Sequence, residues 1–451
     1  MTVPETAKHK NKILPCAEAA ALFLLTIFFA ILCRSHPWRG DFGHKDSNVY
    51  VYMARAILRG DIPYVDAFDN KGPVLYLLET LGYGLGGWTG IWVLEVVALF
   101  TTFWCVYKIA RLAVHSPLPF VALKKNETSS DEDAGPRAFA RRFSCALPFV
   151  AVIYVAAVIY ACFEGGNFTE EYALPFVASS LYIFLHFFYT GCVRRWQLVL
   201  CGAGFAAVAL IRMNMAALWV VMAPAVLLYC LWKKQGRQVW TFLLWFLLGA
   251  ALVAVPVFAW LILRGAWAGF VDAYLLYNAG YIENFGASSI WTRRREAAVF
   301  FLKMPVFLFP AILAVWNALR KRHWLPALYL LLGAVCLGFA ALSGRPYPHY
   351  AMVLAPLAAY SLALSVAVPG AVELIAPVTA EKQASGSSQE STDRPSTNDK
   401  RFSRFVILRV LVALLACALA VPAWFEVGRL TAEYFPTKGK KHRDSFMQEV
   451  A

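Results

Sequence analysis

Long apolar segments recur along this chain, and polar segments separate them. Eleven apolar segments are present, at residues 13–33, 91–113, 144–163, 170–190, 197–211, 215–232, 239–263, 297–319, 324–342, 350–368 and 404–424. A helix of about 20 apolar residues spans the roughly 30 Å hydrocarbon core of a bilayer. One such segment could form a buried helix in a soluble protein, but this series predicts an all-α polytopic membrane protein with about 11 transmembrane helices.

One apolar stretch, residues 198–232, is too long for a single span. As one helix it would run roughly 50 Å, which exceeds the thickness of the hydrocarbon core. Arg212 and Asn214 lie near its middle. We therefore expect a tight turn at these polar residues, a short helix on either side, and Arg212 near the outer surface.

The polar segments differ strongly in length. The segment 34–90 is the longest outer loop in an alternating topology, and 264–296 is the next longest. Within the first, residues 48–59 have helical spacing, with Tyr50 and Ala54 on one face and two arginines on another. This pattern predicts a helix that lies along the membrane surface. Such unequal loops indicate an active site assembled at one membrane face.

The domain organisation follows from the same pattern. Residues 1–368 are expected to form one transmembrane module that contains the site. Residues 380–403 are polar and lack the apolar spacing that nucleates a core, so we expect residues 369–403 to form a disordered cytoplasmic linker. Residues 404–451 are expected to form the last transmembrane helix and a short tail.

Composition and charge agree with a membrane location. Of 451 residues, 60% are hydrophobic and only 16% are charged, whereas soluble domains carry roughly 25% charged residues. The net charge of +14 does not indicate nucleic acid, because the basic residues cluster between apolar segments as in cytoplasmic loops. The clusters are Lys8/Lys10/Lys12, Lys124/Lys125 with Arg141/Arg142, Arg194/Arg195, Lys233/Lys234/Arg237 and Arg320/Lys321/Arg322. This bias places segment 34–90 on the outer side.

Several polar residues inside apolar sequence are assigned to the interior. Glu79 and Glu95 would be costly if they faced lipid, so we expect them to face the protein interior or the membrane interface. The ten cysteines form no Cys-x-x-Cys pair and no metal-ligand spacing. We interpret the cysteines as small core residues.

Asp46 lies just before the helix predicted at 48–59 and has two interpretations. As a structural residue it would be the N-cap, a position that favours Asp. As a functional residue it would be a carboxylate that the helix N-terminus keeps ionised and that points into a cavity.

The residues after Asp46 favour function. The first outer loop carries, in order, Asp46, Tyr50, Gly60, Pro63-Tyr64 and Asp69-x-Lys71-Gly-Pro73. This series resembles the first-loop signature of the GT-C membrane glycosyltransferases. The likeness is greatest to glycosyltransferase family 39, a bacterial branch that includes the lipid A aminoarabinose transferase and relatives of the protein O-mannosyltransferases.

The resemblance implies a GT-C-like bundle and a defined reaction. A hexosyl or pentosyl group would pass from a polyprenyl-phosphate-linked donor to the hydroxyl of a glycan, lipid or protein acceptor, with inversion, at the outer face of the cytoplasmic membrane. Asp46 matches the general base of the family, and Lys71 matches the lysine that binds the lipid phosphate. Ser47 and Asn70 stand where the family often has acids, so the resemblance assigns no cofactor and leaves a divalent cation open.

Other residues on the predicted outer side each have two interpretations. Glu170 and Glu171 follow Asn167, which fits a capping box or a pair of carboxylates that bind an acceptor sugar or a cation. Arg345 and His349 lie in a short loop with tyrosines, which fits a membrane-interface belt or a phosphate-binding pair. Further candidates for substrate binding are Tyr50, Tyr64, Asp69 and Arg212.

Two other classes of function compete with the enzyme. A transporter or flippase for lipid-linked saccharides would carry its ionisable residues at mid-membrane along a pathway, whereas here they gather in outer loops. A non-catalytic scaffold for envelope assembly would not need Asp46 and Lys71. The sequence therefore favours the glycosyltransferase.

Overall fold

The computed structural model describes residues 5–33, 35–38, 45–115, 136–163, 165–283, 289–321, 324–366, 397–422 and 425. These residues form helices and an isolated β-bridge between Pro63 and Ala67, and they contain no strand. The predicted all-α class is confirmed.

The elements follow one another along the described chain. They are α1 (Glu5–Ala30), α2 (Lys45–Arg59), α3 (Pro73–Gly86), α4 (Trp88–His115), α5 (Pro136–Cys162), α6 (Thr169–Thr190), α7 (Arg195–Ala209), η1 (Met213–Ala216), α8 (Ala217–Trp232), α9 (Gly236–Leu263), α10 (Trp267–Phe270), η2 (Val271–Leu276), α11 (Tyr277–Glu283), α12 (Ile290–Lys303), α13 (Pro305–Lys321), α14 (Trp324–Ala340), η3 (Pro348–Leu354), α15 (Ala355–Val366) and α16 (Thr397–Leu419).

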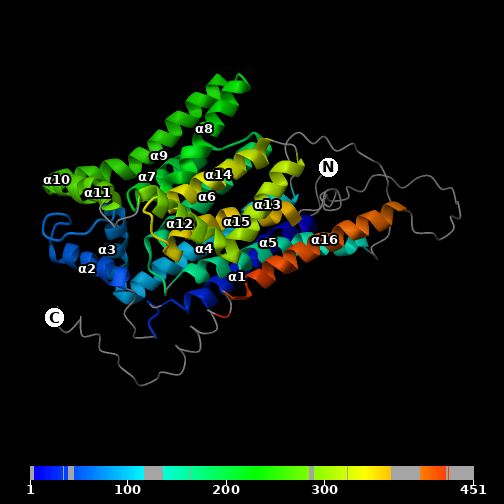
Figure 1. Ribbon diagram of the computed structural model, residues 1–451, viewed down its shortest axis with the longest axis horizontal. Helices are drawn as coiled ribbons and strands as arrows, with labels where there is room; N and C mark the ends of the chain where they lie inside the picture. The colour runs from blue at the N-terminus through cyan, green and yellow to red at the C-terminus, as the bar shows by residue number, and fades with distance from the viewer. Residues whose placement is uncertain are drawn as a thin grey trace.

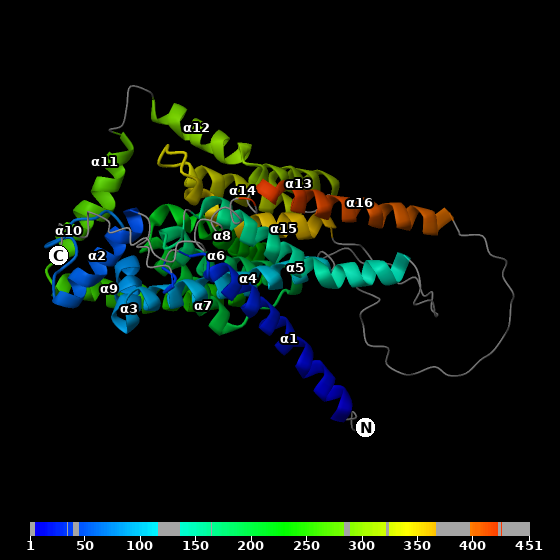
Figure 2. The same ribbon diagram turned by 90° about the horizontal axis from the view of Figure 1, so that it is seen from below.

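The long helices run side by side, and the short ones gather at one end of the molecule. Figure 1 shows α2, α3, α10 and α11 together at the left end, and the view turned by 90° in Figure 2 shows the same grouping. The elements from the two longest predicted outer loops therefore share one end of the bundle.

The apolar helices coincide with the predicted spans. Six are long and apolar enough to cross a membrane, or seven if the bent pair α12 and α13 counts as one. Shorter apolar helices lie at Cys16–Ala30, Arg195–Ala209, Trp324–Ala340 and Arg409–Leu419. Each predicted span thus overlaps an apolar helix among the described residues, while the number of 11 crossing helices stays a prediction.

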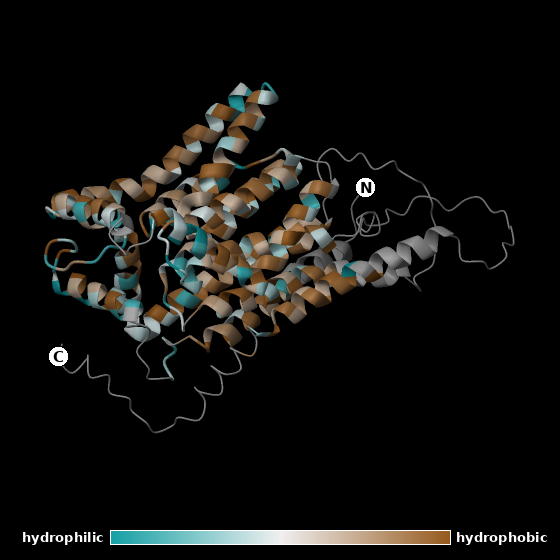
Figure 3. Ribbon diagram, viewed as in Figure 1, coloured by the Kyte–Doolittle hydropathy of each residue, from teal (hydrophilic) through white to brown (hydrophobic). Residues whose placement is uncertain are grey.

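The exposed apolar surface of helix α9 shows most clearly that lipid surrounds the bundle. Only 17% of its most apolar stretch is buried, and Leu244, Leu247 and Leu252 are 64%, 60% and 59% exposed. Figure 3 shows the hydrophobic colour over most of this helix. Because so large an exposed apolar surface suits hydrocarbon rather than water, the chain is a multi-pass membrane protein.

Two helix breaks shape the bundle. The expected division of residues 198–232 is confirmed, because α7 ends at Ala209 and η1 begins at Met213. The segment 297–319, predicted as one span, is instead broken, and α12 and α13 meet at 90°. Met304 has extended backbone angles (φ −68°, ψ 121°) because the next residue is proline, which disfavours helix before it.

Helix α2 confirms the helix predicted at 48–59 and extends it toward the N-terminus. Tyr50 and Ala54 are buried, as the spacing predicts. Asp46 is not the N-cap, because it already lies in the first turn of the helix.

The predicted linker and tail are only partly described. Of the linker at 369–403, residues 397–403 form the beginning of α16, and residues 369–396 lie outside the described residues. The tail after residue 425 lies outside them as well.

Candidate functional site

Lys71 lies in a loop that hydrogen bonds hold firmly between α2 and α3. The Tyr64 hydroxyl donates to the Lys71 carbonyl oxygen (2.7 Å), and the Lys71 N–H donates to the Tyr76 hydroxyl (3.2 Å). The Tyr76 hydroxyl in turn donates to Asp69 Oδ2 (2.8 Å). Tyr64 and Asp69 thus stabilise the conformation of the loop, and in this way both help to position Lys71.

Glycine at position 72 lets this loop meet the end of α7. Gly72 N–H donates to the Ile211 carbonyl oxygen (3.0 Å), and Val74 N–H donates to that of Leu210 (3.1 Å). A Cβ on Gly72 would lie 1.9 Å from the Leu210 carbonyl oxygen. The backbones therefore approach closely only without a side chain, and this contact brings Lys71 beside Arg212.

Helix α11 also supports this loop, through Asn278. Asn70 Nδ2 donates to Asn278 Oδ1 (3.1 Å), and Asn278 Nδ2 donates to the Asn70 carbonyl oxygen (2.8 Å). Asn70 Oδ1 also accepts from Lys71 Nζ (2.8 Å). Asn70, which stands where the family often has an acid, is thus engaged in fixing the lysine.

Arg212 forms a buried ion pair with Glu170. Arg212 Nη1 lies 2.6 Å from Glu170 Oε1, and the two side chains are 17% and 1% exposed. The Thr169 hydroxyl donates to Glu170 Oε2 (2.6 Å), and the guanidinium of Arg212 lies 4.0 Å from the ring centre of Tyr350. Arg212 is thereby fixed by a carboxylate and an aromatic face.

His349 lies against this ion pair within a stack of rings. Its ring stacks on Phe168 at 4.6 Å and meets Tyr350 edge-on at 4.7 Å between centroids. Arg212 and His349 both act electrostatically on Glu170. The His349 side chain is buried, with an exposed fraction of 6%, and phosphate binding by His349 stays a prediction.

Electrostatic interactions connect Asp46 and Lys71 to the same cluster. Burial lowers the pKa of Lys71, and Asp69 opposes this shift most strongly. The charges of Arg212, Asp46 and Glu170 also act on Lys71. Lys71 therefore interacts electrostatically with one further cation and with three carboxylates.

Tyr50 lies within this cluster. Its side chain is 1% exposed, and burial, followed by the charge of Asp46, raises its pKa well above the usual value. Glu170, Arg212 and Asp69 also act on its hydroxyl. The buried hydroxyl is therefore a neutral group between the acids and the cations.

Glu171 lies apart from this cluster although it is adjacent to Glu170. Its Oε2 accepts from the Asn167 N–H (2.9 Å). The capping box expected for Asn167 and Glu170 is not formed, because Asn167 has a positive φ (61°) and the N-cap is Phe168, without a side-chain cap bond. Glu170 thus pairs with Arg212, whereas Glu171 accepts a hydrogen bond from the Asn167 backbone.

Arg345 is oriented within its own loop. Its backbone N–H donates to Ser343 Oγ (3.4 Å), and its Nη1 donates to the Tyr347 hydroxyl (3.2 Å). Phosphate binding by Arg345 stays a prediction.

Sequence reasoning missed Asn278 and Tyr76. Asn278 is 208 positions from its partner Asn70, and a single asparagine in an apolar helix gives no signal of such pairing. Tyr76 lies five residues beyond Lys71, and its spacing from Asp69 alone does not predict the hydrogen bond between them.

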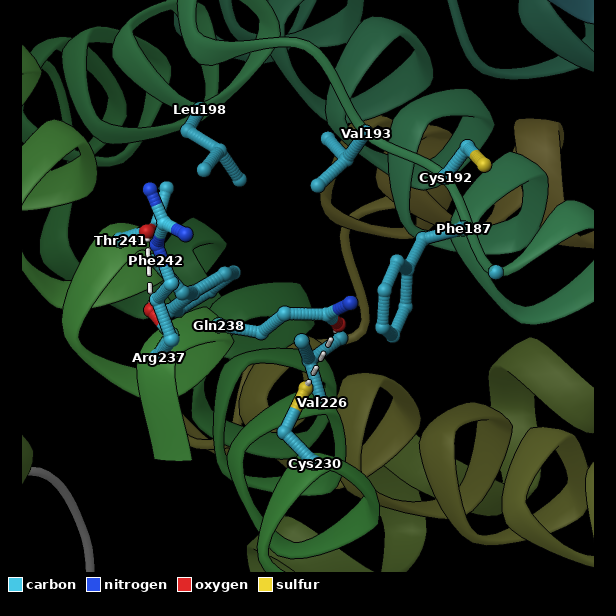
Figure 4. Close-up of a pocket in the computed structure, with 11 residues that line it drawn as sticks. Phe187, Cys192, Val193, Leu198, Val226, Cys230, Arg237, Gln238, Thr241 and Phe242 are labelled. Atoms are coloured by element: carbon cyan, nitrogen blue, oxygen red, sulfur yellow. Dashed lines mark hydrogen bonds between the residues drawn. The ribbon is translucent and has the colours of Figure 1, made fainter. Parts of the chain in front are cut away.

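A separate cavity of about 300 Å³ opens at the far end of α6. Figure 4 shows Phe187, Leu198, Val226 and Phe242 around it, with the polar side chains of Arg237 and Gln238. The Cys230 thiol donates to Gln238 Oε1 (3.8 Å). Because Glu170 begins α6 and Phe187 lies near its end, this cavity is not part of the polar cluster.

Comparison with solved structures shows what this bundle and its polar end resemble. A solved structure with a similar fold is that of ArnT from Cupriavidus metallidurans bound to undecaprenyl phosphate, at 16% identity and a TM-score of 0.52. The match covers 78% of this chain and 60% of that chain, so the protein spans less than two thirds of that neighbour's length.

Other comparisons add less. The apo structure of the same ArnT matches over 94% of this chain and 76% of that chain, at 15% identity and a TM-score of 0.44. Residues 6–116 match a family model described as the putative competence-induced protein Ccs4 N-terminal domain. No curated protein sequence matched the chain.

Proposed function

We propose that the protein is a membrane glycosyltransferase that moves a sugar from a polyprenyl-phosphate-linked donor to an acceptor hydroxyl, with inversion. The observation that carries the proposal is the contact between the Lys71 loop and the end of α7, which brings Lys71 beside the buried Arg212–Glu170 ion pair. The ArnT-like fold supports it, since that neighbour was crystallised with a polyprenyl phosphate.

Lys71 and Arg212 would bind the phosphate of the donor. Phosphate is a good leaving group, so the enzyme needs to stabilise the negative charge that develops as the sugar departs. Lys71 is fixed by Asn70, and Arg212 by Glu170. Cations held in place before the reaction stabilise that charge without reorganisation.

Asp46 would act as the general base. It lies in the first turn of α2, where the helix dipole favours an ionised carboxylate. A carboxylate there would take the proton of the acceptor hydroxyl as that oxygen attacks the anomeric carbon. Attack from the face opposite the departing phosphate inverts the configuration.

The site would face away from the cytoplasm. The basic clusters lie in the segments that alternate with the outer loops, and positively charged loops stay in the cytoplasm. The donor would enter from the bilayer, and the acceptor from the outer aqueous side.

Replacement of Asp46 tests this proposal. Asp46→Asn keeps the shape but removes the base, so turnover should fall by about 10²–10⁴-fold while folding is retained. The measurement is mass spectrometry of envelope glycans from cells lacking the protein and from cells complemented with each variant. Asp61→Asn, on the exposed end of the same loop, is the matched control and should restore the lost sugar. Full restoration by Asp46→Asn would exclude Asp46 from the mechanism.

A further inference from the structure

Three glutamates from three helices meet in the interior, outside the cluster around Lys71. Glu79 lies on α3, Glu95 on α4 and Glu171 on α6, and each is 0% exposed. The charges of Glu171 and Glu79 both act on Glu95. Their burial confirms the expectation that Glu79 and Glu95 face the interior.

Four carboxylate oxygens of this group lack a hydrogen-bond partner. They are both oxygens of Glu79, Oε1 of Glu95 and Oε1 of Glu171. Among the described residues, the ion pairs join Arg59 to Asp61, Arg111 to Glu18 and Arg212 to Glu170, so none compensates the three glutamates. Buried carboxylates without a counter-charge are strongly unfavourable, so protons or a cation should neutralise them.

Hydrogen bonds hold the other oxygens of two of these carboxylates. Glu171 Oε2 accepts the Asn167 N–H (2.9 Å), and Glu95 Oε2 accepts the hydroxyl of Ser35. Both residues thus keep one oxygen anchored and leave Oε1 unpartnered.

The unpartnered oxygens belong to a group with the dimensions of a metal site. Ligand atoms of Glu95, Glu171 and Cys33 lie within 4.8 Å of one another, and all three residues are buried. Ligands at 2.0–2.3 Å from an ion are compatible with this spacing. A Cβ on Gly166 would lie 2.6 Å from Glu95 Oε1, so the absence of a side chain there leaves room beside that oxygen.

We propose that Glu95 and Glu171, with Cys33 and Glu79 beside them, bind a divalent cation. Two carboxylates and a thiol suit Zn²⁺ best, because a sulfur ligand favours softer ions, whereas Mn²⁺ would be held mainly by the carboxylates. The proposal does not depend on the proposed transferase activity.

The cation would stabilise the start of α2. Asn167 lies between the two clusters: its Nδ2 donates to Ser47 Oγ (2.7 Å), its N–H donates to Glu171, and its Oδ1 accepts from the Tyr172 hydroxyl (2.7 Å). Ser47 adjoins Asp46. Binding of a cation by Glu171 would therefore hold Asn167, and through it the first turn of α2.

Metal analysis of the purified full-length protein tests the site. The protein carries an affinity tag without histidine, is incubated in detergent with Zn²⁺ or Mn²⁺ chloride, and is dialysed before inductively coupled plasma mass spectrometry. We expect about one ion per chain, the number that a single ligand cluster holds. Glu95→Gln with Glu171→Gln should lower the content at least about tenfold, since neutral amides are poor ligands.

Matched controls separate binding from folding. Glu296→Gln, an exposed residue of α12, should keep the full metal content. A chelator should lower the melting temperature of the wild type and leave that of the double variant unchanged, because only a bound ion links stability to free metal. Equal metal content in wild type and double variant, or a wild type that binds no ion, overturns the proposal and assigns protons to the cluster.

Discussion

At the scale of single residues, the cluster is organised around two cations that different partners hold. Lys71 depends on hydrogen bonds from its own loop, and Arg212 depends on the buried carboxylate of Glu170. The charge of Glu170 acts on Lys71 as well, as does that of Asp46. We therefore expect substitution of Lys71 to affect mainly catalysis, and substitution of Arg212 to affect stability as well.

Lys71 should determine the alkaline limit of activity. Burial lowers its pKa below the usual value of a lysine, so the ammonium loses its proton, and with it the attraction for phosphate, at a lower pH than a free lysine would. The value of kcat/KM should therefore fall as the pH rises through that lowered pKa. Lys71→Arg should move the alkaline limb upward, because Arg stays protonated. An unchanged limb in this variant would argue against Lys71 as the titrating group.

Removal of the Lys71 charge should reduce catalysis more than folding. Lys71→Met should lower kcat/KM by about 10²–10³-fold, the effect of losing one pre-placed electrostatic group. Steady-state kinetics with the lipid-linked donor measure it. The thermal midpoint in detergent should stay close to that of the wild type, because the loop is held by bonds to the Lys71 backbone.

Arg212 should contribute to stability as well. Arg212→Met leaves the carboxylate of Glu170 buried without its partner, and breaking a buried pair costs roughly 3–5 kcal/mol. Adding Glu170→Gln should recover part of that loss, since the uncompensated charge disappears. Thermal unfolding of both single variants and the double variant measures the coupling. Additive losses would show that the pair does not interact.

At the scale of elements, the site depends on contacts between segments distant in sequence. The loop after α2 lies against the end of α7 through Gly72, and η2 and α11 support it through Asn278. Figure 1 shows these elements grouped at one end of the bundle. A change at such a contact should move Lys71 without touching it.

A side chain at position 72 should disrupt that contact. Gly72→Ala would bring a Cβ to 1.9 Å from the Leu210 carbonyl oxygen, so the loop must shift, at a cost of roughly 1–3 kcal/mol. Activity should fall with the thermal midpoint. Gly84→Ala is the control, because its Cβ meets the Leu58 side chain only at 3.5 Å and alanine favours a helix. Normal activity in Gly72→Ala would contradict the close contact.

At the scale of the whole molecule, the polar end and the basic clusters should lie on opposite sides of the membrane. In a cysteine-free background, Asp61→Cys should react with a membrane-impermeant maleimide added to intact cells. Gln235→Cys should react only after permeabilisation, because it adjoins Lys233 and Lys234 in a positively charged loop. Labelling of both from the same side would refute the proposed orientation.

The sequence by itself determined the class of the protein and the segment that carries the candidate site. Apolar segments of membrane length need no tertiary information, because the bilayer imposes the length. Helix α2 was also predictable from its helical spacing. The break between α7 and η1 near Arg212 was predictable because polar residues interrupt the apolar pattern there.

Only the tertiary structure decided which acids work together. Glu170 and Glu171 are adjacent in sequence, but neighbours on a helix point about 100° apart, so one pairs with Arg212 and the other joins Glu79 and Glu95. The right-angle bend before α13 and the partners of buried groups likewise depend on how helices pack. A sequence pattern predicts which face of each helix is buried, whereas the tertiary fold determines which helix packs against that face.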